Sequence, residues 1–304
     1  MAIFKDHLEL LIFRIFKSLI FILPRKFCLV WGKTLGLIFY YLDKRHRRIA
    51  LSNLKIAFGK ELTSSDLKRV ARGTFMHYGS SLMDIIKFSS LAEKRKTALI
   101  RVEGEKNLLT ALQEKKGAIL FTAHYGSWEI VPFYVSKFGK LSVIARALDN
   151  KRLEKELHKL RTNLGAKVIY KHLATKQILQ SLRAKELVAF LIDQNVQKHQ
   201  AIFIDFFGRK AATTPSLAAF FLKTQSPIIP VFCFPTPSHH YHIQILKPLE
   251  IELEGDYQQQ VLKITQICTK IIEVQVRKNP EYWFWIHNRW KTRPDQAEED
   301  RFEQ

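Results

Sequence analysis

The chain has 304 residues, and its 49 Lys and Arg against 28 Asp and Glu give a formal net charge of +21. Such an excess indicates an anionic partner: a nucleic acid, an anionic membrane face, a phosphorylated lipid or an acidic protein. Hydrophobic residues make up 47% of the chain, which is enough for a large folded core. The cysteines Cys28, Cys233 and Cys268 are far apart in apolar stretches, which excludes a disulfide framework and a cysteine metal cluster.

The chain begins with two apolar stretches that predict membrane-associated helices. Residues Leu8–Leu23 are rich in Leu, Ile and Phe, but Glu9, Arg14 and Lys17 interrupt them. The run is shorter than the roughly 20 apolar residues that a spanning helix needs. We therefore expect an interfacial or marginally spanning helix, with a buried core helix as the alternative. The next stretch, Phe27–Leu42, carries aromatic residues that favour the membrane–water boundary, so the expected anchor covers about residues 8–42.

A basic cluster follows these stretches and consists of Lys44, Arg45, Arg47 and Arg48. Its position indicates the cytoplasmic side of a membrane, unless it is simply a solvated helix start. Another helix is predicted from Thr63 to about Phe88. Residues 1–95 are therefore expected to form an all-helical, membrane-associated extension.

From residue 96 to residue 304, strand and helix patterns alternate. Strands are predicted over Ala118–Thr122, Leu141–Arg146, Leu187–Ile192, Ile228–Phe234 and Tyr241–Leu246. Helices are predicted over Trp128–Lys137, Lys151–Leu164, Thr175–Arg183, Pro215–Thr224 and Tyr257–Arg277. This alternation predicts an α/β domain with a mainly parallel central sheet flanked by helices.

The main candidate for chemistry lies where the first predicted strand ends, in the stretch AILFTAHYGSWEIVPFY. His124 follows the strand, and Glu129 lies in the first turn of the next helix. Because a strand–turn–helix corner folds the chain back, we expect the Glu129 carboxylate to reach the His124 ring and fix its tautomer. The other ring nitrogen then takes a proton from an incoming hydroxyl. The alternative is a strand-end histidine bonded to nearby backbone beside a capping glutamate.

Further candidates follow other predicted strands. Arg146 ends the second strand and Arg161 lies on the next helix, and guanidinium groups bind phosphate in a bidentate manner. Asp193 follows the strand over Leu187–Ile192, which suits a substrate pocket or a support for the catalytic pair. The alternatives are surface arginines and a helix-capping aspartate.

Two segments combine basic residues with unusual neighbours. In FFGRKAATTPS, Gly208 permits a sharp turn and Pro215 starts a helix, so Arg209 and Lys210 beside a helix amino end predict an anion site. The segment PEYWFWIHNRWKTRP interleaves aromatic and basic residues, which suits base stacking or, more commonly, a buried strand or a lipid-facing edge. We interpret its His287 as structural.

Taken in order, these motifs resemble a known family. The series LPRKF, RRIALSNLKIAF, HYGSWE, ARALDN, LIDQN, FFGRKAATTPS and PEYWFWIHNRWK covers nearly the whole chain. It is similar to the bacterial late acyltransferases of lipid A biosynthesis, the lauroyl/myristoyl transferases, which belong to the wider group of acyltransferases with an H-x4-D/E signature. The sequence contains no P-loop, G-x-G-x-x-G, zinc spacing or G-x-S-x-G elbow, so no cofactor or metal is expected.

The resemblance implies transfer of a fatty acyl group from acyl carrier protein to a hydroxyl of a lipid A precursor, an anionic phosphorylated glycolipid. It implies His124 as the base and Glu129 as its orienting carboxylate. The matching segments also contain the expected substrate-binding residues Arg146, Arg161, Asp193 and Arg209. The expected location is the cytoplasmic face of the inner membrane, in contact with its lipid and with no nucleic acid partner.

Two alternatives stay open. One is an acyltransferase that uses coenzyme A and acylates another glycolipid or a lysophospholipid. The other is a basic membrane-binding or nucleic-acid-binding protein without catalysis, although no groove-reading motif supports it.

Overall fold

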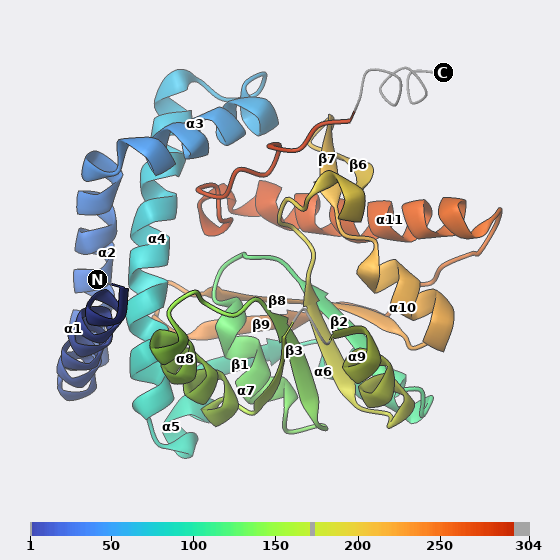
Figure 1. The fold of residues 1–304 in the computed structure, drawn as a ribbon, viewed down its shortest axis with the longest axis horizontal. Coiled ribbons are helices and arrows are strands. Elements are labelled where there is room, and N and C mark those ends of the chain that lie inside the picture. Colours follow the sequence, from blue (N-terminus) through green and yellow to red (C-terminus); the bar gives the residue numbers. More distant parts are fainter. Residues whose placement is uncertain (1, 171–173, 295–304) are drawn as a thin grey trace.

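A seven-stranded sheet lies at the centre of the computed structural model, which describes residues 2–170 and 174–294 (Figure 1). The strands lie in the order β1-β9-β8-β2-β5-β3-β4. Five neighbouring strands run parallel: β8, β2, β5, β3 and β4. Strand β9 pairs antiparallel with β8, and β1 pairs parallel with β9. The prediction of an α/β fold with a mainly parallel sheet is confirmed. The bounds are β1 Ile100–Glu103, β2 Ala118–Thr122, β3 Leu141–Ala145, β4 Ala166–Tyr170, β5 Leu187–Leu191, β8 Ile228–Pro235 and β9 Tyr241–Ile245.

Strands β2 and β5 are almost entirely apolar because both faces of the sheet are covered. In β2, Ile119 and Phe121 belong to one core cluster, and Ala118 and Leu120 belong to the other. Strand β5 alternates in the same way. The first core is closed by helices α9 Ala174–Arg183, α10 Ser216–Thr224 and α11 Tyr257–Lys278. The second is closed by α6 Glu105–Gln113, α7 Val131–Val135 and α8 Lys151–Asn163.

A separate hairpin of β6 Ile202–Phe206 and β7 Arg209–Thr213 packs on α11 (Figure 1). The segment FFGRKAATTPS therefore folds differently from the expectation. Its Gly208 does form the sharp turn, but the turn joins two strands, and all of β7 separates Arg209 from the start of α10. Because a strand rises about 3.4 Å per residue, the expected anion site at a helix end is not assembled.

The N-terminal region is helical, as predicted, and consists of α1 Ala2–Ile22, α2 Arg25–Leu42, α3 Lys44–Phe58, α4 Ser64–Ser90 and α5 Glu93–Ala98. Leu54 of α3 and Phe75 of α4 share a core with Phe121 of the sheet, so these helices complete the fold. Within residues 2–170 and 174–294, every helix is too short or too polar to cross a membrane.

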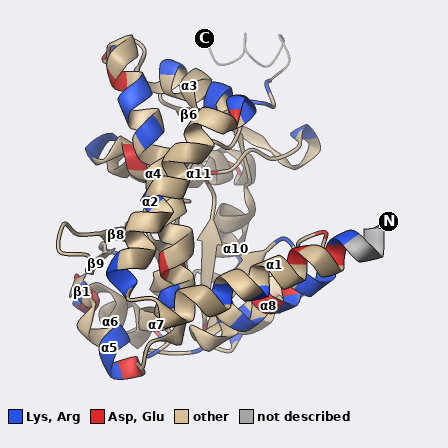
Figure 2. Ribbon diagram, turned by 90° about the vertical axis from the view of Figure 1, so that its left-hand side faces the viewer, with Lys and Arg blue, Asp and Glu red and all other residues tan. Residues whose placement is uncertain are grey.

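The outer surface of α1 and α2 is nonetheless apolar. Helix α1 lies along α8 at the edge of the molecule, and α2 packs on α4 (Figure 2). The large apolar side chains exposed on these two helices are Leu8, Leu11, Ile12, Ile15, Leu19, Phe21, Ile22, Phe27, Val30, Trp31, Leu35, Ile38, Phe39, Tyr41 and Leu42. We call this set the α1–α2 apolar face. It is much larger than the scattered apolar residues of an ordinary surface and indicates an interaction site.

Glycines allow α2 and α4 to approach at backbone distance. A Cβ atom on Gly79 of α4 would lie 2.2 Å from the carbonyl oxygen of Gly32 and 2.9 Å from the Cα of Gly36. Backbone atoms cannot move aside as a flexible side chain does. Any larger residue at this position therefore forces the two helices apart.

We predict that Gly79→Ala destabilises the protein by about 1–3 kcal/mol, because overpacking outweighs the gain in helix propensity. The measurement is the midpoint of thermal unfolding. Gly139→Ala is the control, since a Cβ there would come no closer than 3.8 Å to the Leu187 side chain. Equal midpoints for the two variants would contradict the close packing of α2 and α4.

Candidate active site

The register of the sheet brings His124 and Asp193 together. Strands β2 and β5 are parallel neighbours, and Thr122 at the end of one pairs with Leu191 at the end of the other. His124 and Asp193 each lie two residues beyond this pair, so they leave the same edge of the sheet side by side. Carboxyl ends of parallel strands are the usual location of ligand sites in α/β proteins.

Asp193 holds the histidine through two hydrogen bonds and accepts a third from a tryptophan. Its Oδ1 accepts from Nδ1 of the His124 ring at 2.9 Å, and its Oδ2 accepts from the His124 backbone N–H at 2.9 Å. The indole Nε1 of Trp283 donates to the same Oδ2 at 2.8 Å. Burial alone would raise the pKa of Asp193, but the His124 charge and these hydrogen bonds outweigh it, and the pKa is lowered. The ionised carboxylate can only accept, so Nδ1 donates to it, and in the neutral ring this arrangement leaves the lone pair on Nε2.

The other side of the ring faces a different environment. Nε2 of His124 lies 3.2 Å from the side-chain amide nitrogen of Gln194, and the histidine side chain is 22% exposed. Trp128 and Phe284 contact the ring, with centroids 5.2 Å and 6.1 Å away. Tyr78 of α4 donates to the backbone carbonyl of His124 at 2.6 Å. The result is a fixed imidazole whose Nε2 lies beside the Gln194 amide and whose ring borders aromatic side chains.

Glu129 does not take the place expected of it. Among the described contacts of Glu129, the ion pair is with Arg161, whose Nη2 lies 2.8 Å from Oε1. After His124 the chain makes bridges to Trp283 and Cys233 before the short helix Trp128–Ile130 begins, and this carries Glu129 towards α8. The geometry therefore corrects the predicted His124–Glu129 contact, since Asp193 occupies that position. The Glu129 charge and a hydrogen bond raise the pKa of Arg161 although its burial acts in the opposite direction.

An apolar pocket of about 450 Å³ opens next to this site. Its walls come from α1, α4, α8 and the segment after His124, and they include Trp128, Phe284, Tyr78 and Glu129. A row of leucines, Leu153, Leu157 and Leu160, lines it from α8. Its volume lies in the roughly 300–1,000 Å³ range of ligand pockets, and its lining suits a hydrocarbon chain.

The other predicted binding residues lie farther from the histidine. Arg146 follows β3, and β5 lies between β3 and β2 in the sheet. The strands that precede Arg146 and His124 are therefore two strand spacings apart, each of ~4.8 Å. Arg146 is exposed, and Arg209 lies at the tip of the β6–β7 hairpin. In the described chain no group of three His, Cys, Asp or Glu side chains is arranged to hold a metal ion.

The Trp-rich segment packs in the core next to the site and forms neither a regular strand nor a lipid-facing edge. Trp283 and Trp285 are fully buried, and Trp283 bonds Asp193 as described. His287 accepts the backbone N–H of Asn195 at 2.9 Å through Nε2, so its role is structural, as interpreted. No local signal in the sequence assigned Trp283 or Tyr78 to the site. Gln194 directly follows Asp193 in the polar run after β5, a position that suits a substrate pocket.

Comparison with known proteins identifies the family. The model of the bacterial lipid A biosynthesis acyltransferases matches residues 5–292. The chain belongs to this family.

Curated relatives agree with the assignment. The chain is 24% identical over 266 residues to the lipid A biosynthesis palmitoleoyltransferase of Escherichia coli (strain K12), covering 86% of this chain and 84% of the relative. It is 22% identical over 270 residues to the lauroyltransferase of the same organism, covering 87% and 85%. The match to the myristoyltransferase is 21% over 254 residues, covering 83% and 77%.

Among solved structures, the 1-acyl-sn-glycerophosphate acyltransferase of Thermotoga maritima aligns with 80% of this chain and 96% of its own. The TM-score is 0.37 and the identity 13%, a similarity too low to bear on function. The family assignment therefore depends on the sequence matches. In this acyltransferase, the His124–Asp193 pair with an apolar pocket next to it is the candidate active site.

Acid is expected to lower the stability of the folded protein through protonation of His287. Burial lowers its pKa to about 4 from the ordinary 6.5. Between these values the unfolded chain binds a proton that the folded state excludes, so this contribution to stability is complete above pH 6.5 and is lost as the pH falls towards 4. We predict that the thermal midpoint falls from pH 6.5 to pH 5 and that His287→Gln, which keeps an acceptor for Asn195, flattens this dependence.

The control is His199→Gln, which replaces an exposed histidine. His77, whose pKa burial also lowers to about 4, keeps part of the slope in both variants. Identical slopes for the wild type and His287→Gln would contradict the role assigned to His287.

Proposed function

We propose that the protein transfers a fatty acyl chain from acyl carrier protein to a hydroxyl of a lipid A precursor, with His124 as general base and Asp193 as its orienting carboxylate. The observation that carries this proposal is the His124 ring, bonded through Nδ1 to Asp193, whose aromatic neighbours Trp128 and Phe284 line the apolar pocket. The acyl chain occupies the pocket, and its thioester carbonyl lies near Trp128.

The His124 ring carries the proton from the acceptor hydroxyl to the leaving thiolate. Nε2 removes the proton of the acceptor hydroxyl as its oxygen attacks the thioester carbonyl carbon. The tetrahedral intermediate collapses, the C–S bond breaks, and the leaving thiolate takes the proton back from the imidazolium. The Asp193 charge stabilises the imidazolium while it exists, and such base catalysis contributes roughly 10²–10⁴ in rate.

Gln194 has a specific place in this scheme. Its amide lies 3.2 Å from Nε2, where the acceptor hydroxyl has to bind. We propose that the amide moves to hold that hydroxyl or the developing oxyanion when the acceptor enters. Removal of one oxyanion donor costs about 10²–10³ in rate in comparable enzymes.

The positive charge supports anionic substrates. A net charge of +21 raises the encounter rate with an acidic carrier protein and with a phosphorylated glycolipid. Arg146 is exposed at the substrate edge of the sheet and stays a candidate for headgroup binding, as does Arg209. Arg161 acts through Glu129: the ion pair fixes the Glu129 side chain, which lines the pocket. The relatives are named as lipid A acyltransferases, which supports the acceptor class.

We further propose that the α1–α2 apolar face lies in the cytoplasmic surface of the inner membrane. Exposed leucine, isoleucine and aromatic side chains on two adjacent helices match an interfacial helix pair. Helix α1 also forms a wall of the pocket through Phe13, so the same helix touches lipid on one side and the acyl site on the other. A substrate that carries several acyl chains reaches the pocket without leaving the bilayer.

Catalytic variants test the assigned roles. His124→Ala is expected to lower kcat by about 10²–10⁴ because the base is lost, and Asp193→Asn to lower it similarly because the ring tautomer is no longer fixed. Glu129→Gln is the matched comparison, since it also replaces a carboxylate by an amide. It is expected to lower activity through Arg161 without changing the pH at which activity rises.

The measurement is the pH dependence of transfer from acyl carrier protein and, in parallel, from acyl coenzyme A. Normal activity of Asp193→Asn with a shifted pH profile for Glu129→Gln would reverse the two assignments. Transfer from coenzyme A alone would replace the proposed donor.

Membrane binding is tested with Leu11→Glu combined with Ile15→Glu, one turn apart on α1. Each apolar side chain buried contributes about 1.5–3 kcal/mol, so partitioning onto anionic vesicles is expected to weaken by at least tenfold. Co-sedimentation with the vesicles measures it. Val274→Glu, at an exposed apolar position on α11, is the control and is expected to bind as wild type does. Unchanged binding of the α1 variant would contradict the proposed anchor.

A further inference from the structure

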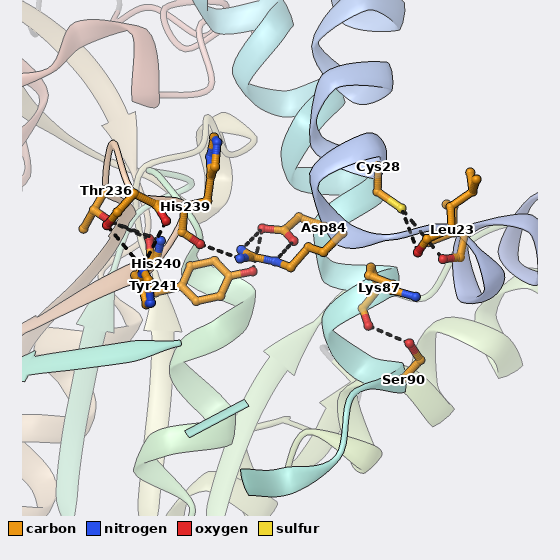
Figure 3. Close-up of polar contacts among 12 residues, drawn as sticks. Leu23, Cys28, Asp84, Lys87, Ser90, Thr236, His239, His240 and Tyr241 are labelled. Carbon is orange, nitrogen blue, oxygen red and sulfur yellow. Dashed lines mark hydrogen bonds and ion pairs between the residues drawn. The ribbon is translucent and has the colours of Figure 1, made fainter. Parts of the chain in front are cut away.

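A buried polar cluster closes one end of the apolar pocket. Asp84 of α4 accepts from Nε of Arg25 at 2.7 Å and from Nη2 of Arg25 at 2.8 Å. The hydroxyl of Tyr241 donates to the same carboxylate at 2.6 Å. Figure 3 shows Asp84 and Tyr241 facing each other between α4 and the start of β9. We call Arg25, Asp84 and Tyr241 the end cluster, and both Asp84 and Tyr241 line the pocket.

Burial divides the pocket lining into an exposed mouth and a buried floor, and the end cluster belongs to the floor. The lining residues Leu82 and Leu148 are 58% and 44% exposed and mark the mouth. Ile86, Ile130 and Tyr241 are at most 2% exposed and mark the floor. Along α4, the pocket runs from Tyr78, which bonds the His124 carbonyl, to Ile86. Those eight residues of helix correspond to about 12 Å.

We propose that the end cluster sets the longest acyl chain that the enzyme transfers, with the Tyr241 ring as the stop. This inference rests on the proposed function, because it takes the pocket as the donor's acyl site. A chain that reaches Tyr241 has its methyl group against the ring. Each further methylene has to displace that ring or push between Asp84 and Arg25.

The cluster is suited to act as a fixed stop because its polar groups are paired with one another. Both Asp84 oxygens are occupied, and the guanidinium of Arg25 also donates to the His239 carbonyl and lies 5.0 Å from the Tyr241 ring centroid. Removing one partner of a buried ion pair leaves an uncompensated charge, so the cluster resists opening. An apolar floor of leucines would adjust more easily to a longer chain.

Three elements meet in the cluster, which fixes the position of the stop. Arg25 begins α2, Asp84 lies in α4, and Tyr241 begins β9. Tyr241 also packs edge-on against Phe88, with centroids 5.4 Å apart. The depth of the pocket is thus set by the docking of the N-terminal helices on the sheet domain.

The test is a competition assay with decanoyl, lauroyl, myristoyl and palmitoyl carrier proteins and one lipid A precursor. Tyr241→Leu removes the stop. We compare kcat/KM for the chain two carbons longer than the wild-type optimum with kcat/KM for the optimum itself. The ratio of the two is expected to rise by about tenfold or more, since one methylene in a tight pocket is worth roughly 10–200-fold. Arg25→Gln removes the ion pair with Asp84 and is expected to broaden the acyl-chain preference towards longer chains.

Tyr241→Phe is the matched control. It keeps the ring, and Arg25 still pairs both Asp84 oxygens, so the preferred chain length is expected to stay that of the wild type. An unchanged preference in both Tyr241→Leu and Arg25→Gln would overturn the proposal. A shift confined to the acyl chains of the acceptor would also overturn it, because the pocket would then hold the acceptor.

A binding measurement separates this proposal from the proposed function. The same series of free fatty acids is titrated calorimetrically against wild type, Tyr241→Leu and Tyr241→Phe. If the wild type transfers no acyl chain but Tyr241→Leu alone binds longer fatty acids, the stop is supported and the proposed reaction is wrong. If Tyr241→Leu does not fold, Ile86→Val, which shortens a neighbouring floor residue, is expected to shift the preference in the same direction by a smaller factor, and no shift would count against the stop.

Discussion

The bond between Asp193 and His124 is the constraint on which the site depends. It requires β2 and β5 to be parallel neighbours in a register that ends both strands at the same level. It also requires a buried carboxylate, which Trp283 and the His124 backbone stabilise. The C-terminal segment and the central sheet therefore together fix the orientation of the His124 ring. Without this network, an ionised aspartate at this depth would be strongly unfavourable.

The N-terminal helices give the site its second property, a place for hydrocarbon. Helices α1 and α4 form pocket walls, and Glu156 of α8 binds both Arg14 and Lys17 of α1, at 3.1 Å and 3.0 Å. These charges, which interrupt the apolar sequence of α1, hold the helix against α8 while Leu11, Ile12, Ile15 and Leu19 face outward. A charged residue in an apolar helix thus has a structural explanation that also accounts for an interfacial position.

The sequence predicted the elements whose signal is local. Strands β2 and β5 are buried runs of apolar residues, and their predicted bounds agree with the structure to within one residue. Strands β1 and β4 lie at the sheet edges, where Arg101 and Lys167 interrupt the apolar pattern, and they were not predicted. The His124–Asp193 contact depends on strand order, which spacing along the chain does not contain. Local spacing favoured Glu129 for that reason.

The protonation of the His124 ring tests the account most directly. Nitrogen NMR of histidine-labelled protein at neutral pH, with the signal assigned by its loss in His124→Gln, reports which ring nitrogen carries the proton. The account predicts a proton on Nδ1 in the wild type and a mixture of tautomers in Asp193→Asn. A proton on Nε2, or a spectrum that Asp193→Asn leaves unchanged, would contradict it.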